Sequence, residues 1–156
     1  MPEGGELYDE DFFLWTQEQA AALRRAKDSN LPIDWENLAE EIEGLGKSDR
    51  RELTSRLRRI LRHLFKLEAS PAPRPRAGWR ATIVDARSEI ESVLRDSPSL
   101  RRQIDEFVKE QLKAAAKLAA NDLGERDEPA ELVRERLRNG GFTAEQVLGD
   151  WFPEPS

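Results

Sequence analysis

Apolar side chains return at every third or fourth position along most of this chain, and that spacing constrains its fold more than any other feature. The clearest run is Leu53, Leu57, Ile60, Leu64 and Leu67, at i, i+4, i+7, i+11 and i+14. Residues at this spacing share one face of a helix, so we expect 47–67 to be helical with these side chains in a core. The same spacing predicts further helices, over 9–27, 34–46, 79–95, 97–123 and 131–139, and one more from residue 143.

Composition agrees with a helical fold. Charged residues make up 36% of the chain and β-branched residues are few, which is typical of amphipathic helices packed together. A length of 156 residues favours one domain. We therefore expect an all-α protein: a compact helical bundle of four main helices plus short C-terminal helices. Residues 1–7 are expected to be a disordered lead and residues 8–153 a single helical domain.

Several positions predict where helices start or stop. Gly44 and Gly46 each weaken a helix by about 1 kcal/mol relative to alanine, which predicts a bend or break there. The segment 70–78 has three prolines in five residues and is expected to be a stiff, extended connection. Ser97, followed by proline, is a predicted N-cap. Thr143 is expected to open a short helix with a capping box.

The sequence also excludes several classes of protein. There is no cysteine, so disulfides and thiolate metal sites are ruled out. The N-terminal residues lack the basic and apolar regions of a signal peptide. No apolar run approaches the roughly 20 residues of a membrane helix. We expect a cytoplasmic protein with no membrane partner and no cofactor.

Charge is unevenly placed along the chain. Residues 1–46 carry a formal net charge of −9, residues 47–80 carry +8 and residues 81–156 carry −5. In one interpretation, the basic helix packs beside the acidic first helices and the charges neutralise each other. In the other, basic side chains opposite the leucine stripe bind nucleic acid or an acidic partner. The candidate binding residues are Arg51, Arg58, Arg59, Arg62, Lys66, Arg74 and Arg76.

An acidic protein partner, or self-association, ranks above nucleic acid for this basic surface. Nonspecific affinity for nucleic acid depends on summed phosphate contacts, and the whole chain is acidic, with a net charge of −6. Few aromatic residues are interleaved with the arginines to stack on bases. Nucleic-acid binding through 51–76 therefore stays as an alternative.

Catalytic motifs are missing, with one weak exception. The sequence has no phosphate loop and no nucleophile elbow, and no Glu-x-x-His pair for a di-iron site. His63 is the one histidine, and we expect it to be a boundary residue hydrogen-bonded to a neighbouring helix. A metal-dependent hydrolase would require Glu40, Glu41 or Glu43 to meet His63 across the bundle. Glu40 and Glu43 are then the metal-ligand candidates.

Five ordered blocks resemble a known family. They are YDEDFFLWTQEQ at 8–19, ENLAEEIEGLG at 36–46, RILRHLFKL at 59–67, WRATI at 79–83 and DSPSL at 96–100. Together they make the chain similar to the bacterial domain-of-unknown-function family number twenty-nine, over about residues 8–152. The resemblance implies an all-α fold and no established activity.

Motif positions of that family match here at Trp15, Glu40, Glu41, His63, Trp79 and Arg80. The resemblance gives none of them a role, and it directs attention to Glu40, Glu41, His63 and Arg80 as candidate catalytic residues. With no catalytic motif, a small size and segregated charge, we expect a noncatalytic protein–protein interaction module. An antitoxin-like partner from a small bacterial operon is one form of that hypothesis.

Overall fold

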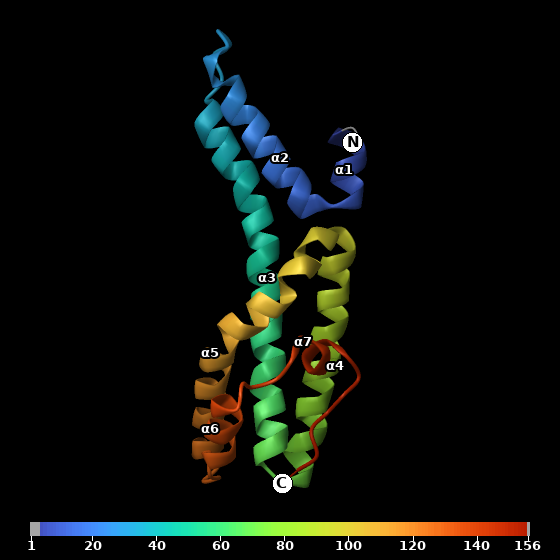
Figure 1. Cartoon of the computed structure of the whole chain (residues 1–156), viewed down its shortest axis with the longest axis vertical. Coiled ribbons are helices and arrows are strands. Elements are labelled where there is room, and N and C mark those ends of the chain that lie inside the picture. The colour runs from blue at the N-terminus through green and yellow to red at the C-terminus, as the bar shows by residue number, and fades with distance from the viewer. Residues whose placement is uncertain (1–3, 156) are drawn as a thin grey trace. The chain divides into compact units, whose positions relative to one another are not determined.

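A computed structural model describes residues 4–155, and all the regular structure in this range is helical (Figure 1). The expected all-α helical fold is confirmed. The elements are α1 (Gly4–Glu10), α2 (Phe12–Arg25), η1 (Ala26–Asp28), α3 (Trp35–Ala69), α4 (Pro73–Asp96), η2 (Pro98–Gln103), α5 (Ile104–Glu125), α6 (Glu131–Arg138) and α7 (Ala144–Leu148). They group into two compact units: unit 1 comprises 1–53 and 92–102, and unit 2 comprises 54–91 and 103–156.

The chain is helical from Gly4, so the expected disordered lead differs from the structure over residues 4–7. The remainder of that expectation, residues 1–3, lies outside the described residues. Leu7 explains the order, because its side chain is buried in unit 1 and its carbonyl accepts a hydrogen bond from the Asp11 N–H at 2.8 Å.

Asp11 divides the helix predicted over 9–27 into α1 and α2. Its backbone is extended (φ −154°, ψ 90°) and its side chain accepts a hydrogen bond from the Leu14 N–H at 3.0 Å, as an N-cap does. The same carboxylate accepts hydrogen bonds from the backbone and hydroxyl of Ser99 at 2.7 and 2.9 Å. Ser97 directly precedes η2, which begins at Pro98, and its hydroxyl accepts a hydrogen bond from the Phe13 N–H at 3.0 Å. Tertiary contacts thus decide where α2 begins.

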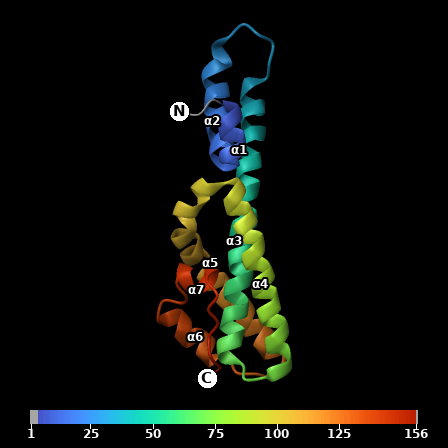
Figure 2. The same cartoon turned by 90° about the vertical axis from the view of Figure 1, so that its right-hand side faces the viewer.

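In unit 1, α2 and the first part of α3 form an antiparallel hairpin (Figures 1 and 2). The break predicted at Gly44 and Gly46 is wrong, because α3 is helical throughout from Trp35 to Ala69. Gly46 is needed for the packing: a Cβ there would lie well inside van der Waals contact of the Thr16 Oγ1 and 3.2 Å from Phe13 Cδ2. Close approach of α2 compensates the weak helix propensity of glycine.

The apolar stripe predicted along α3 is confirmed where it was clearest. Leu53, Leu57, Ile60, Leu64 and Leu67 are all completely buried. Leu53 belongs to unit 1 and the other four belong to unit 2, where Ile83, Ile90, Phe107 and Leu123 of later elements are also among the largest fully buried side chains. Figure 2 shows α4 running antiparallel to the later part of α3.

Proline-rich 70–78 is mostly helix rather than the predicted extended connection, because α4 begins at Pro73. Proline is tolerated in the first turn of a helix, where the missing N–H would have no partner in any case. Arg76 then donates hydrogen bonds to the carbonyls of Leu67 and Ser70 near the end of α3, the latter at 2.9 Å. The predicted capping box is confirmed at Thr143.

The C-terminal segment is held on unit 2 by Arg87 of α4. Its guanidinium donates to the carbonyls of Val147 at 2.8 Å, Gln146 at 3.0 Å and Trp151 at 2.7 Å. It also lies over the ring of Phe152, 4.8 Å from the centroid. Across residues 4–155, none of the helices has the length and apolar character needed to cross a bilayer.

Candidate functional site

Part of the predicted basic surface is neutralised inside unit 2. Arg62 donates two hydrogen bonds of 2.6 Å to the carboxylate of Asp122 on α5, and Lys66 lies 3.1 Å from the same carboxylate. Hydrogen bonding to Arg62 holds the pKa of Asp122 below its ordinary value, and Lys66 adds to the effect. These two cations are paired with α5, rather than with the acidic first helices as one interpretation expected.

The remaining predicted binding residues divide into three groups. Arg76 is engaged with the carbonyls at the end of α3, as described above. Arg51, Arg59 and Arg74 have exposed side chains, and Arg51 lies with its Nε 3.4 Å from the carbonyl of Lys47. Arg58 lines a pocket.

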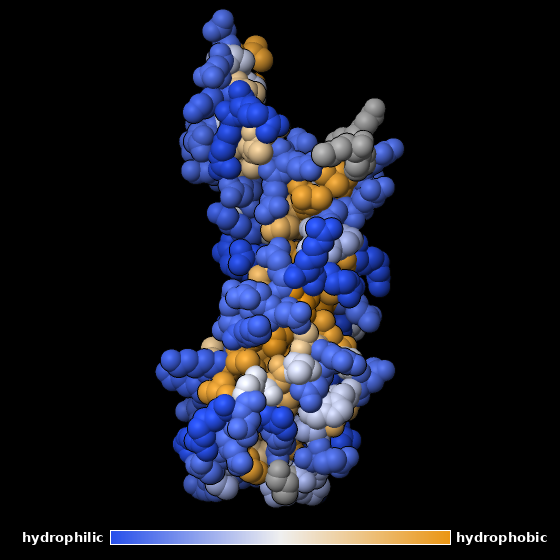
Figure 3. Space-filling model, viewed as in Figure 1, coloured by the Kyte–Doolittle hydropathy of each residue, from blue (hydrophilic) through white to orange (hydrophobic). Residues whose placement is uncertain are grey.

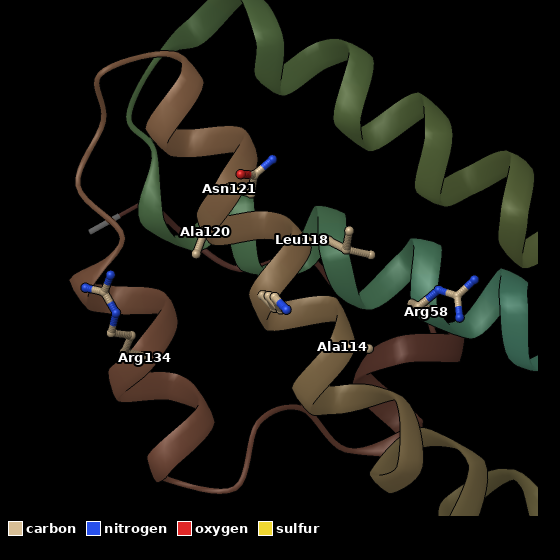
Figure 4. Close-up of a pocket in the computed structure, with 7 residues that line it drawn as sticks. Arg58, Ala114, Leu118, Ala120, Asn121 and Arg134 are labelled. Atoms are coloured by element: carbon tan, nitrogen blue, oxygen red, sulfur yellow. The ribbon is translucent and has the colours of Figure 1, made fainter.

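That pocket, with a volume of about 670 Å³, lies in unit 2 on the surface of α5 (Figure 4). Figure 4 shows Arg58 of α3 and Arg134 of α6 on opposite sides of α5. We call it the basic pocket, and its lining residues are Arg58, Ala114, Lys117, Leu118, Ala120, Asn121 and Arg134. Three cations therefore surround a floor made of two alanines and a leucine.

No carboxylate lines the basic pocket, and its cations are weakly committed elsewhere. The Nη1 of Arg58 is 3.5 Å from the side-chain oxygen of Gln111, at the limit of a hydrogen bond. Lys117 makes no ion pair or hydrogen bond with the residues that the structure describes. Arg134 lies 3.4 Å from Glu131, and both side chains are more than 60% exposed. Exposed pairs of this kind stabilise by about 0–1 kcal/mol, so the cations can turn to another anion.

Sequence reasoning missed Lys117 and Arg134. A signal was present on α5, because Ala114, Lys117, Leu118 and Asn121 stand at i, i+3, i+4 and i+7, on one helix face. Arg134 carried no such signal. It stands beyond the loop that follows α5, and only tertiary packing places α6 beside that face.

The candidate catalytic residues are not brought together. Glu40 and Glu41 are exposed on α3 in unit 1. Glu43 accepts a hydrogen bond from Arg24 at 2.7 Å, and this contact lowers the pKa of its carboxyl. Glu43 belongs to unit 1 and His63 to unit 2, and no hydrogen bond or ion pair joins them among the residues that the structure describes. The described residues therefore do not form the carboxylate–histidine contact that a hydrolase would require.

His63 is half-buried in unit 2 and bonds to its own helix rather than to a neighbouring one. Its Nδ1 lies 2.8 Å from the carbonyl of Arg59, and because a carbonyl only accepts, Nδ1 donates. Burial lowers the pKa of the imidazole, and the cationic Lys66 and Arg62 lower it further. The neutral imidazole of His63 therefore packs at the edge of the core.

Arg80, the fourth candidate, lies over the ring of Phe152 at 5.3 Å from the centroid, on the side of unit 2 that holds the C-terminal segment. Its neighbours suit a positioning role for that segment. Among the residues that the structure describes, no three histidine, aspartate or glutamate side chains gather closely enough to hold a metal ion. Glu40 and Glu43 thus have no third ligand within that range.

Comparisons with known proteins agree with the helical fold and point to a family of unknown function. The family model described as "Domain of unknown function DUF29" matches residues 7–152. A crystal structure of an alpha-helical protein of unknown function from Rhodospirillum rubrum is similar, at 26% identity and a TM-score of 0.69, over 94% of this chain and 98% of that one. No curated protein matches the chain. Since the family model spans nearly all of it, the chain belongs to the DUF29 family, whose function is unknown.

Proposed function

We propose that this protein is a noncatalytic interaction module that binds an acidic segment of a partner protein at the basic pocket. The observation that carries the proposal is the lining of this pocket by three cations and no carboxylate, over an apolar floor. An antitoxin-like partner in a small operon is one form of such a module.

Charge and apolar character together favour a peptide segment over other anions. Arg58, Lys117 and Arg134 attract carboxylates, and arginine in particular binds them in a bidentate geometry. Ala114 and Leu118 offer an apolar floor that a phosphate backbone would not use. An amphipathic acidic helix meets both demands, because it carries leucines on one face and glutamates beside them.

Nucleic acid is the weaker candidate for this surface. Arg62, Lys66 and Arg76 are engaged in contacts inside unit 2, so fewer cations remain for phosphates than the sequence indicates. Nonspecific binding to nucleic acid requires many such contacts at once. No aromatic ring lines the basic pocket to stack on bases.

A peptide titration tests the proposal. We would measure fluorescence anisotropy of two labelled synthetic helices with the same leucine spacing, one carrying glutamates and the other lysines on the flanks. The wild type should bind the acidic helix and not the basic one, with an affinity that falls as salt rises. Lys117→Glu combined with Arg134→Glu should weaken binding by about tenfold or more, because like charges then face each other.

Lys109→Glu is the matched control, because Lys109 is also exposed on α5 but does not line the basic pocket. It changes the net charge of the chain as each single pocket substitution does. Equal binding of the acidic helix by the wild type and by the double pocket variant would contradict the proposal. If Lys109→Glu loses as much binding as the pocket variant, the loss comes from net charge and not from the basic pocket, and the proposal is contradicted.

A further inference from the structure

A second unpartnered surface lies on the α2–α3 hairpin of unit 1. The hairpin contact uses the small residues of α3, since Ala39 is completely buried and Gly46 touches Thr16. The large residues are left outside: Leu38 is 41% and Leu45 is 51% exposed. On the face drawn in Figure 3, hydrophobic residues lie open among hydrophilic ones along this hairpin.

Acidic side chains accompany these exposed leucines. Asp34, Leu38, Glu41 and Leu45 follow one another at intervals of four, three and four residues, so they form a single row that starts one residue before α3. The Asp34 carboxylate already accepts two hydrogen bonds from Asn37, so Glu41 is the uncommitted acid of the row. We call these four residues the acidic row. Glu41 is exposed and makes no ion pair or hydrogen bond with the described residues. Within the described part of the chain, the row is therefore an acidic amphipathic surface whose leucines stay 41% and 51% exposed.

Net charge separates in the same way. Unit 1 contains fifteen acidic and nine basic side chains, a formal net charge of −6, whereas unit 2 contains sixteen of each. The acidic row thus lies in the acidic unit, and the basic pocket in the neutral one. Each surface has the chemistry that the other lacks: leucines with carboxylates on one, an apolar floor with cations on the other.

From this match we infer that a second copy of this chain is the partner, with the acidic row of one copy docked on the basic pocket of the next. The inference rests on the proposed function and names its partner. Among the described residues, no hydrogen bond or ion pair engages Glu41 or Lys117, so both charges are available to a second copy. Parallel pairing of row to row is disfavoured, since Glu41 of one copy would meet Glu41 of the other.

This contact is heterologous, because two different surfaces of the chain meet. Each copy keeps a free row or a free pocket after docking, so further copies can add until the assembly closes into a ring. The mass in solution should therefore rise with concentration. It should fall with added salt, since the charges lie at the rim of the contact.

Sedimentation equilibrium of the full chain over a concentration series tests the inference. Glu41→Lys should weaken self-association by about tenfold. Glu40→Lys is its matched control, because Glu40 is equally charged and exposed on α3 but stands outside the acidic row. Leu38→Ser with Leu45→Ser should also weaken it, without loss of folding, as both side chains are exposed.

Mixing separates a specific contact from a general effect of charge. Glu41→Lys retains an intact pocket, and Lys117→Glu with Arg134→Glu retains an intact acidic row, so the two variants should associate when mixed although neither does alone. A wild type that stays monomeric up to millimolar concentration overturns the inference. If the acidic synthetic helix still binds that monomer at the pocket, the proposed function stands; if it does not, both fail.

Discussion

Gly46→Ala is the substitution for which the structure makes the sharpest prediction about stability. In an open helix, replacing glycine by alanine stabilises by about 1 kcal/mol. At this position the added Cβ would overlap the Oγ1 of Thr16, whose side chain is completely buried, and would touch Phe13. The hydroxyl of Thr16 cannot simply rotate away, because it donates a hydrogen bond of 2.6 Å to the carbonyl of Phe13.

The expected net effect combines three contributions. Overpacking a tight contact costs about 1–3 kcal/mol, and disturbing the Thr16 hydrogen bond costs about 1 kcal/mol. Improved helix propensity offsets about 1 kcal/mol of that. We therefore expect Gly46→Ala to lower the free energy of unfolding by about 1–3 kcal/mol. Gly44→Ala, where a Cβ would meet nothing within 4 Å, should raise it by about 0.5–1 kcal/mol.

Urea unfolding followed by circular dichroism measures both variants against the wild type. The two substitutions are chemically identical and two residues apart, so a difference in sign isolates the contact with α2. Thr16→Ala should partly rescue Gly46→Ala, since it removes the overlapping oxygen, and the double-mutant cycle should show that coupling. A Gly46→Ala protein as stable as Gly44→Ala would refute the packing that we describe for the hairpin.

Other expectations concern unit 2 and cooperativity. Asp122→Asn should lower the free energy of unfolding by about 2 kcal/mol, because charged hydrogen bonds are lost. The pKa of this carboxyl is lowered in the folded protein. Its contribution to stability is therefore fully present above the pKa of the unfolded state and is lost as pH falls through the pKa of the folded state. Burial lowers the pKa of His63, so an NMR titration should give a pKa below the ordinary value of 6.5. The free energy of unfolding should then decline as pH falls below about 6.5, because the unfolded chain binds a proton that the folded protein does not. A measured pKa above 6.5 would contradict the burial of this imidazole. Arg87→Ala should speed hydrogen exchange in the segment around Trp151, and unchanged rates would show that this arginine does not hold it. If residues 8–153 form a single domain, as expected, every probe should report one unfolding transition, because α3 supplies residues to both units. Two separate transitions would contradict the single domain.

The strongest periodicities in the sequence were sufficient to predict helices and core. Leu57 and Leu64 are completely buried as expected, because five apolar residues on one face leave a helix few ways to pack. The capping box at Thr143 was equally predictable, since it depends only on local residues. Where the signal is local or strongly repeated, sequence suffices.

Boundaries set by tertiary contacts could not be predicted. Gly46 suggested a break, yet it marks the point of closest approach to Thr16. Asp11 looked like one more acid in a first turn, yet it caps α2 and binds Ser99, 88 residues away. Proline at 73 starts α4 because the first helical turn does not need its N–H. Each result depends on a neighbour that sequence spacing does not reveal.

The basic pocket illustrates the same limit for function. Charge segregation drew attention to Arg58, which lines the basic pocket. Arg62 and Lys66 instead pair with Asp122 on α5, a partner that no sequence spacing indicated. Their neutralisation moves the candidate site away from the helix that carries most of the positive charge.

NMR chemical-shift mapping locates the binding site of an acidic partner on the chain. When the acidic synthetic helix is added to the isotopically labelled full chain, we expect the largest amide shifts at Arg58, along 114–121 and at Arg134. The basic helix, added at the same concentration, should leave those amides in place. Shifts of equal size throughout the chain, or a maximum elsewhere, would contradict the assignment of the basic pocket as a binding site.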